Sequence, residues 1–241
     1  MSGKQKVNYG IDAPGVIRNL LIFGVICFVL PFLVPLIRVG SVKIDISWLV
    51  WTGFYLSLSG ILMLVYSLFG KFTHRDRMLN MLSWTGVEQV LDVGTGKGLL
   101  MIGAAKRLTT GKSTGIDIWN AEDLTGNNIE NALKNAEIEG VSNKISIENE
   151  NAMEMSFADN SFDIIVSNLC IHNIYNKEGR YAACKEISRV LKKEGTGIIS
   201  DYRHTREYKH NFDQLGLQTK LCTANFLTTF PPHRILIIKK A

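Results

Sequence analysis

The chain has 241 residues and carries 27 Lys and Arg against 22 Asp and Glu, a formal net charge of +5. This length suits one α/β domain plus an additional segment, and because the charges are spread along the chain we expect the basic excess to complement a membrane surface, not nucleic acid. No metal site is expected, because no histidine has zinc-site spacing to the widely separated Cys27, Cys170, Cys184 and Cys222.

Two uncharged runs dominate the first third of the chain. A polar lead, residues 1–15, is expected to be flexible, and the uncharged runs follow at 19–37 and 46–70. Each is at or above the roughly 20 apolar residues that a helix needs to cross about 30 Å of hydrocarbon. Residues 16–70 therefore predict two transmembrane helices joined by a short loop. A cleaved signal peptide is disfavoured because a second run follows the first, and two buried helices of a soluble protein are the alternative.

Flanking residues indicate how this hairpin is oriented. Basic residues precede and follow it, whereas its loop is nearly neutral, so the positive-inside rule places both termini and the rest of the chain in the cytoplasm. Pro31 and Pro35 are expected to loosen the end of the first span. An aromatic belt is expected at the start of the second, at Trp48, Trp51 and Tyr55. Oligomeric state stays open, although a Ser-x-x-Gly at 57–60 permits close helix packing.

The remainder of the chain alternates strands with helices. Residues 71–84 predict an amphipathic helix with a basic start, which would hold the following domain, 85–241, against the membrane surface. Strands are predicted at 90–93, 115–118, 144–148, 162–167 and 197–200, helices at 99–108, 124–139, 180–191 and 205–215, and a closing antiparallel pair at 217–224 and 234–239. This order predicts an α/β fold with a doubly wound, mostly parallel, seven-stranded sheet.

A glycine-rich turn follows the first strand of this domain. Asp92 precedes three glycines at alternate positions, Gly94, Gly96 and Gly98. Leu99 stands where a dinucleotide fingerprint needs its third glycine, which disfavours a nicotinamide dehydrogenase. The Asp-x-Gly-x-Gly-x-Gly pattern instead resembles motif I of the class I S-adenosylmethionine (SAM) dependent methyltransferases. Asp117, at the end of the next strand, is then expected to accept both ribose hydroxyls of SAM.

The same resemblance implies further cofactor contacts. Asn151 and Ala152 follow the third strand, where that family commonly has a Gly-Asp-Ala sequence that holds the adenine; Asn151 can still accept from the adenine amino group. Asn168 begins the segment after the fourth strand, beside the expected methyl group. Its Ser-Asn start is similar to small-molecule methyltransferases of the ubiquinone/menaquinone and arsenite types. It lacks the Asn-Pro-Pro-Tyr of amino-group methylation, so a nucleic-acid acceptor is not expected.

Three residues are candidates for proton transfer. His172 follows Asn168 and is the best general-base candidate, because an unperturbed imidazole titrates near neutrality; a structural histidine is the alternative. Asp201 and His204 lie in a charge-rich segment after the fifth strand, at another carboxyl edge of the sheet, where substrates bind. Cys170 as a thiolate nucleophile is a less favoured hypothesis, because it sits between apolar neighbours.

Together these features predict a membrane-anchored SAM-dependent methyltransferase. The short link between the hairpin and the first strand favours a small acceptor that partitions into the bilayer: a quinone, a lipid, a thiol or a phenol. The alternative is a non-catalytic SAM-binding membrane sensor or assembly factor, which the unusual Glu150-Asn151 pair leaves open.

Overall fold

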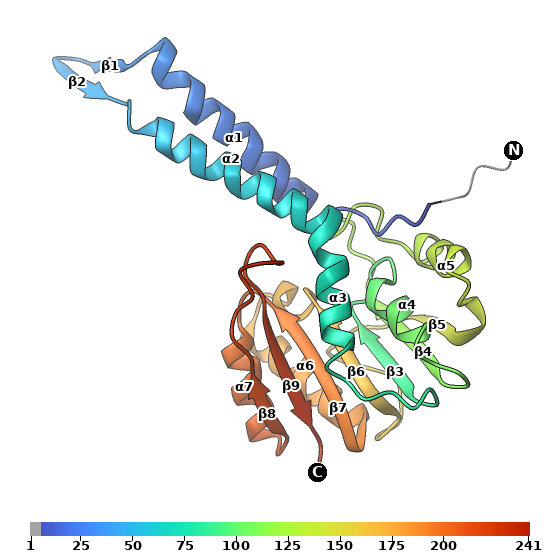
Figure 1. The fold of residues 1–241 in the computed structure, drawn as a ribbon. Coiled ribbons are helices and arrows are strands. Elements are labelled where there is room, and N and C mark those ends of the chain that lie inside the picture. The colour runs from blue at the N-terminus through green and yellow to red at the C-terminus, as the bar shows by residue number, and fades with distance from the viewer. Residues whose placement is uncertain (1–5) are drawn as a thin grey trace, which may run out of the picture.

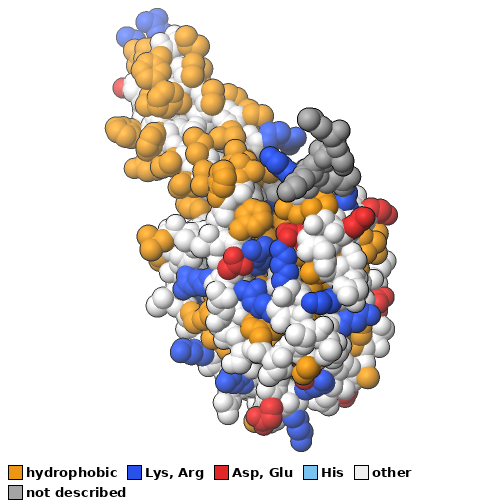
Figure 2. Space-filling model, turned by 45° about the vertical axis from the view of Figure 1, so that its right-hand side comes forward, with side chains coloured by type: hydrophobic (Ala, Val, Ile, Leu, Met, Phe, Trp, Pro, Cys, Tyr) orange, Lys and Arg blue, Asp and Glu red, His pale blue; other side chains and the backbone are white. Residues whose placement is uncertain are grey.

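The computed structural model describes residues 6–241 and has two parts, a long helical hairpin and an α/β domain from which the hairpin projects (Figure 1). The hairpin consists of α1 (Pro14–Leu33) and α2 (Leu49–Val65), and its tip is a small antiparallel pair, β1 (Leu36–Val39) and β2 (Val42–Asp45). Both helices belong to helical segments that are long and apolar enough to cross a membrane. Apolar side chains cover the hairpin, whereas charged side chains are spread over the domain (Figure 2).

The two hairpin helices differ from the predicted spans at the loop. The prediction of helix through residue 37 is wrong: α1 ends at Leu33, because Pro35 disfavours a helical backbone at Val34, whose φ of −140° and ψ of 80° are not helical. The two helices pack closely in their middle. A Cβ on Gly24 would collide with Ser57, and one on Gly53 would collide with the backbone of α1. Small residues therefore let α1 and α2 approach each other.

The second helix runs into the α/β domain without a break. After α2 the chain continues as a π-helical turn, η1 (Tyr66–Gly70), and then as α3 (Lys71–Leu79). The predicted amphipathic helix at 71–84 is thus shorter than expected. It also has a different environment, because Met78 and Leu79 are fully buried against the sheet and α4 (Leu99–Ala105). We conclude that α3 is a layer of the domain and continues directly into the hairpin.

The domain confirms the predicted seven-stranded sheet. Its strand order is β5-β4-β3-β6-β7-β9-β8, with β3 to β7 parallel and β9 antiparallel to both β7 and β8. The strands are β3 (Gln89–Val93), β4 (Lys112–Asp117), β5 (Ile145–Asn149), β6 (Phe162–Asn168), β7 (Leu191–Asp201), β8 (Gln218–Leu221) and β9 (Arg234–Lys239). The remaining helical elements are α5 (Ile129–Ile138), η2 (Ser142–Lys144), η3 (Ile171–Asn173), α6 (Lys177–Val190) and α7 (Thr205–Gln214).

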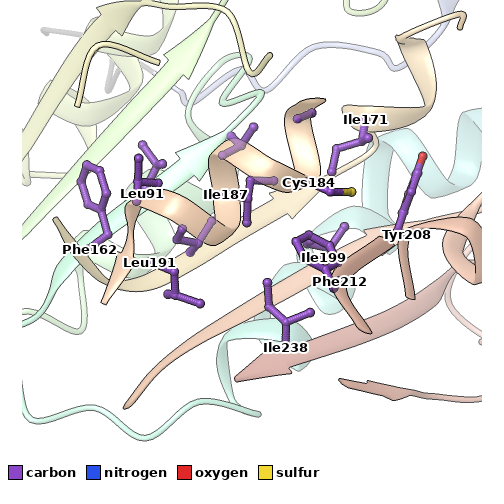
Figure 3. Packing of buried hydrophobic residues seen from close by; sticks show 14 of the residues in the cluster. Leu91, Phe162, Ile171, Cys184, Ile187, Leu191, Ile199, Tyr208, Phe212 and Ile238 are labelled. Carbon is purple, nitrogen blue, oxygen red and sulfur yellow. The ribbon is translucent and has the colours of Figure 1, made fainter. Parts of the chain in front are cut away.

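Two hydrophobic layers enclose the sheet. Successive residues of a strand point to opposite faces, and on β6 Ile164 packs with α3 and α4 while Ile165 packs with α6 and α7. Figure 3 shows the second layer, in which Ile187 of α6 and Phe212 of α7 lie against the strands. Burial on both faces explains the continuous apolar runs of the central strands. The doubly wound arrangement places all parallel carboxyl ends at one edge, beside the base of the hairpin (Figure 1).

The N-terminal segment departs from its predicted flexibility. Residues 1–5 lie outside the described part of the chain, but Tyr9 is buried in the domain. The ammonium group of Lys71 donates to the carbonyls of Tyr9 (2.8 Å) and Gly10 (2.6 Å) and pairs with Asp12 (3.3 Å). Backbone hydrogen bonds also link Ile11 and Ala13 to the segment at 123–125. Residues 8–13 therefore form a strap fixed to the domain, because Lys71 supplies the donors that the strap carbonyls need.

Candidate active site

The three glycines of the turn after β3 all adopt left-handed backbone conformations. Their φ angles are 76° at Gly94, 53° at Gly96 and 86° at Gly98, which is a region that other residues rarely enter. The space above them is tight: a Cβ on Gly94 would collide with the side chain of Cys170, and one on Gly96 would come within 2.9 Å of Leu124. The turn thus forms a close backbone cradle, as predicted from the spacing.

Asp92 lies beneath this cradle and is almost fully buried. Its Oδ2 accepts from the Thr95 hydroxyl (2.9 Å) and the Met101 backbone N–H (2.8 Å), whereas its Oδ1 has no hydrogen-bond partner in the protein. Burial raises the pKa of the Asp92 carboxyl to about 7, and the charge of nearby Asp117 adds to the rise. A buried oxygen without a partner is costly, so Asp92 is poised to accept from a cationic ligand.

Asp117 stands at the end of β4, next to the cradle. Its Oδ2 accepts from the Gly96 N–H (2.8 Å) and its Oδ1 from the Trp119 N–H (2.7 Å). The Asn127 carboxamide approaches Oδ1 at 3.4 Å. Asp117 is therefore held at the place predicted for a ribose-binding acid. Sequence reasoning did not single out Asn127, whose own Oδ1 is buried without a partner.

The residues predicted to hold the adenine lie beyond β5. Asn151 is exposed and forms a tight turn with Glu154, in which its Oδ1 accepts from the Met153 N–H at 2.9 Å. A carboxamide oxygen has a second lone pair, so this contact leaves one acceptor position. Ala152 is half-buried and packs against the core of the domain. Ile118, which the sequence reasoning did not select, is 65% exposed directly after Asp117 and offers an apolar surface at the same edge.

The segment after β6 covers the glycine cradle. Asn168 is the last residue of β6, and its Oδ1 is buried without a partner. Cys170 packs directly on Gly94. Burial raises the pKa of the Cys170 thiol well above its usual range, and four nearby carboxylates raise it further. The thiol is thus held protonated, which counts against the thiolate hypothesis.

His172 and Asp201, which are 29 positions apart, form a hydrogen-bonded pair. The His172 Nδ1 lies 3.0 Å from Asp201 Oδ1 and 3.1 Å from its Oδ2, and the His172 backbone N–H donates to Oδ2 at 3.2 Å. The carboxylate also accepts from the Tyr202 N–H (2.8 Å) and from the buried Tyr208 hydroxyl (3.3 Å). A carboxylate has no proton to donate, so in the neutral imidazole Nδ1 carries the proton and Nε2 keeps a free lone pair.

His204 lies apart from this pair. Its backbone is left-handed, with φ 60°, immediately before α7, and its Nδ1 lies 3.4 Å from Glu207. Glu207 itself pairs with the Arg180 guanidinium at 2.9 Å. The structure therefore joins His172 to Asp201, but it places the predicted His204 in a separate ion-pair network.

The site residues together fit a cationic, nucleotide-like cofactor. Among the carboxylates at this edge, Asp92, Asp117, Asp123 and Asp201 all act on the Cys170 thiol. SAM carries a sulfonium and an ammonium, for which such an acidic surrounding is favourable. The glycine cradle admits a close-lying ligand, and the Oδ1 atoms of Asp92, beneath the cradle, and of Asn168, at the end of the neighbouring strand β6, are acceptors without a partner. Asp117 would hold the ribose, and Asn151 with Ala152 would lie at the adenine.

Comparisons with known proteins agree with this geometry. A family model described as a methyltransferase domain matches residues 86–235. A sterol 24-C-methyltransferase of Aspergillus fumigatus is 33% identical over 135 residues, which are 54% of this chain and 33% of that protein. A demethylmenaquinone methyltransferase of Bacteroides fragilis is 34% identical over 125 residues, which are 52% of this chain and 47% of that protein. The chain thus spans less than half the length of these relatives.

A solved structure supports the fold. The SAM-dependent methyltransferase from Aquifex aeolicus superposes with a TM-score of 0.54 at 17% identity, over 68% of this chain and 88% of that one. The match to the family model covers more than half of this chain and includes the glycine cradle and both members of the His172–Asp201 pair. The chain belongs to the methyltransferase-domain family, and the residues of its site fit SAM as the cofactor.

Proposed function

We propose that this enzyme is anchored in a membrane by its hairpin and methylates a small acceptor that partitions into the bilayer: a quinone, a lipid, a thiol or a phenol. The observation that carries this proposal is the place of the hairpin base. The Tyr66 ring, at the end of the second span, packs 4.9 Å from the His233 ring. His74, about two turns further on, hydrogen bonds with Ser200 of β7 at 2.6 Å. The base therefore lies at the carboxyl edge of the sheet, where the site is.

The surface of the hairpin supports a bilayer environment. Large apolar side chains along both helices are more than a third exposed, among them Phe23, Phe32 and Phe54 (Figure 2). A contiguous apolar surface of this extent is unfavourable in water and marks a membrane or protein contact. With both termini and the catalytic domain on the cytoplasmic side, the active site would face the inner surface of the bilayer.

Two of the relatives support a hydrophobic acceptor, whereas others are named for a release factor and a ribosomal protein. Those described above are named for a sterol and for demethylmenaquinone, both of which are small hydrophobic molecules. We propose a small hydrophobic acceptor for the present enzyme, without assigning it a sterol or demethylmenaquinone.

In this proposal His172 and Asp201 handle the proton of the methyl acceptor. SAM supplies a methyl group on a sulfonium, and its transfer is an in-line displacement that depends mainly on positioning. His172 would accept the proton of an acceptor hydroxyl or thiol at Nε2, because Nδ1–H is held by Asp201. Tyr208 and two backbone N–H groups fix the Asp201 carboxylate. Asp201 in turn holds the orientation and tautomer of His172.

The test is transfer of tritiated methyl from SAM by the full-length, detergent-purified protein, supplied with an extract of host membranes. After the reaction, products are partitioned between organic solvent and water. We expect SAM-dependent label in the organic phase. Label that appears only in water-soluble products would refute a bilayer-resident acceptor while leaving the methyltransferase activity intact.

A further inference from the structure

A second group of polar side chains meets at the hairpin base, outside the glycine cradle and the His172–Asp201 pair. Tyr66 comes from η1, His74 from α3 and His233 from the residue before β9; they are 4%, 1% and 1% exposed. The rings of His74 and Tyr66 flank His233, at centroid distances of 5.1 and 4.9 Å. The side chain of Asn168, at the end of β6, is a hydrogen-bonding neighbour of the Tyr66 hydroxyl, although the contact falls short of full hydrogen-bond geometry and leaves the hydroxyl and Asn168 Oδ1 without a well-formed bond.

These four residues hold most of the unsatisfied polar atoms in the described part of the chain. The atoms without a partner are the Tyr66 hydroxyl, His74 Nδ1, both ring nitrogens of His233 and Asn168 Oδ1. Only His74 Nε2 is engaged, with the Ser200 hydroxyl. Buried polar groups are nearly always hydrogen-bonded. Five such atoms from three separate segments of the chain therefore lie together, and a polar ligand group that reached them would supply the missing hydrogen bonds.

The electrostatics of the cluster select a neutral ligand group. Burial lowers the pKa of His74 to about 4 and that of His233 to about 3, so both imidazoles are uncharged and each has one donor and one acceptor nitrogen. The nearby charges are mixed: Asp12 and Asp201 act on Tyr66, Arg77 acts on His74 and His172 acts on His233. The cluster itself offers two neutral imidazoles, a phenol and a carboxamide and no cation to pair with an anion, so a hydroxyl or carbonyl oxygen satisfies such a site.

The cluster lies next to an apolar surface at the hairpin base. The segment between β8 and β9 packs on η1, where a Cβ on Gly70 would come within 2.5 Å of the Thr228 carbonyl. This segment exposes Phe226 (76%) and Leu227 (96%), and η1 exposes Phe69 (68%). Figure 1 shows the β8–β9 connection rising to the base of the hairpin. A ligand leaving the bilayer would meet this surface first.

We propose that Tyr66, His74, His233 and Asn168 form the head-group site of the methyl acceptor, and that this acceptor carries a neutral oxygen, as a phenol, a quinol or a quinone does. The inference rests on the proposed function and narrows its acceptor class. Asn168 joins the two regions, because it ends β6 beside the glycine cradle and also borders Tyr66. An oxygen held by the cluster would place the rest of the acceptor ring near His172.

The test uses the full-length protein in detergent with graded amounts of total host lipid extract as the probe. Tyr66→Phe removes one hydroxyl and keeps the ring, and His233→Gln replaces an imidazole with an amide. Matched controls are Tyr55→Phe, at an exposed hairpin position, and His210→Gln, at an exposed position of α7. We expect Tyr66→Phe and His233→Gln to raise the half-saturating extract concentration by about three- to tenfold each, the loss of one hydrogen bond. SAM affinity and maximal rate stay near wild type, and both controls behave as wild type.

The outcomes separate this inference from the proposed function. If wild type labels the organic phase and Tyr66→Phe leaves the half-saturating concentration unchanged, the head-group site is wrong and the proposed function stands. If the organic product is a methylated phospholipid, the neutral-oxygen assignment is wrong. If His233→Gln unfolds the protein, the isosteric Tyr66→Phe variant decides. Label confined to water would overturn both the proposed function and this inference.

Discussion

The Asp201→Asn substitution tests the chemistry assigned to the active site. The Asp201 side chain is 1% exposed and faces only donors: the His172 Nδ1–H and backbone N–H, the Tyr202 N–H and the Tyr208 hydroxyl. An amide offers one oxygen and places an NH₂ against some of these donors. If that NH₂ faces the imidazole, Nδ1 becomes the acceptor and the proton moves to Nε2. His172 Nε2 then has no free lone pair, so it cannot take the proton from the hydroxyl or thiol of the methyl acceptor.

The expected effect on turnover is large and specific. General-base catalysis contributes about 10²- to 10⁴-fold, so we expect turnover to fall within that range. The unpaired donors would lower the free energy of unfolding by about 1–3 kcal/mol. SAM affinity, measured by calorimetry, is expected to fall much less than turnover, because Asp201 is only one of the four acids that surround the cofactor site. The control is Asp163→Asn at the amino end of β6, whose carboxylate pairs with Lys192. A loss of turnover below tenfold, with the fold intact, would refute the assigned role of the pair.

Three further predictions concern the cradle and the histidines. Gly94→Ala forces a left-handed alanine against Cys170, so we expect about 1–3 kcal/mol of lost stability together with weaker SAM binding, measured by thermal unfolding and calorimetry; unchanged affinity would contradict the cradle. The pKa of Asp92 is raised in the folded state, so native stability falls as pH rises from about 4 to 7. In Asp92→Asn, the free energy of unfolding measured in urea is expected to fall less steeply over this pH range. Identical pH profiles for wild type and variant would contradict the raised pKa of Asp92. His172→Ala is expected to lose turnover with SAM affinity unchanged, whereas His204→Ala is expected to keep its turnover. Equal losses of turnover in the two variants would contradict the different roles given to these histidines.

Local sequence was sufficient for the cofactor side of the site. The glycine conformations and the acids at the strand ends depend on residues close in the chain, so spacing together with the resemblance to motif I placed Asp92, the three glycines and Asp117 around one turn; their binding of SAM stays a prediction. The sheet was also predictable, because strands buried on both faces leave continuous apolar runs. His172 and Asp201 were both candidates, since parallel strands bring their carboxyl ends to one edge. Their pairing, however, depends on the register of β6 with β7, which composition does not reveal.

Contacts between distant segments were not predictable. Tyr66 lies in an uncharged run that looks like ordinary membrane helix, His74 in a basic stretch, and His233 after two prolines; nothing in their neighbours indicates that they meet. Lys71 counts as a surface cation in the positive-inside pattern, but it is buried because the strap carbonyls and Asp12 surround it. The polar lead was expected to be flexible because the segments that hold it in place are far from it in the sequence. Its anchors come from distant segments: Lys71 lies 62 residues from Tyr9, and Asn135, which accepts from the Asn8 N–H, lies 127 residues from Asn8.

The most direct test of delivery from the bilayer is a surface-dilution experiment. The full-length enzyme is reconstituted in vesicles of total host lipid extract, which are then diluted with synthetic phosphatidylcholine while the amount of extract per volume is held constant. An acceptor that reaches the site through the membrane predicts that methyl transfer falls in proportion to the fraction of extract in the bilayer. A rate that depends only on the bulk amount of extract would contradict the account, because the acceptor would then arrive from water.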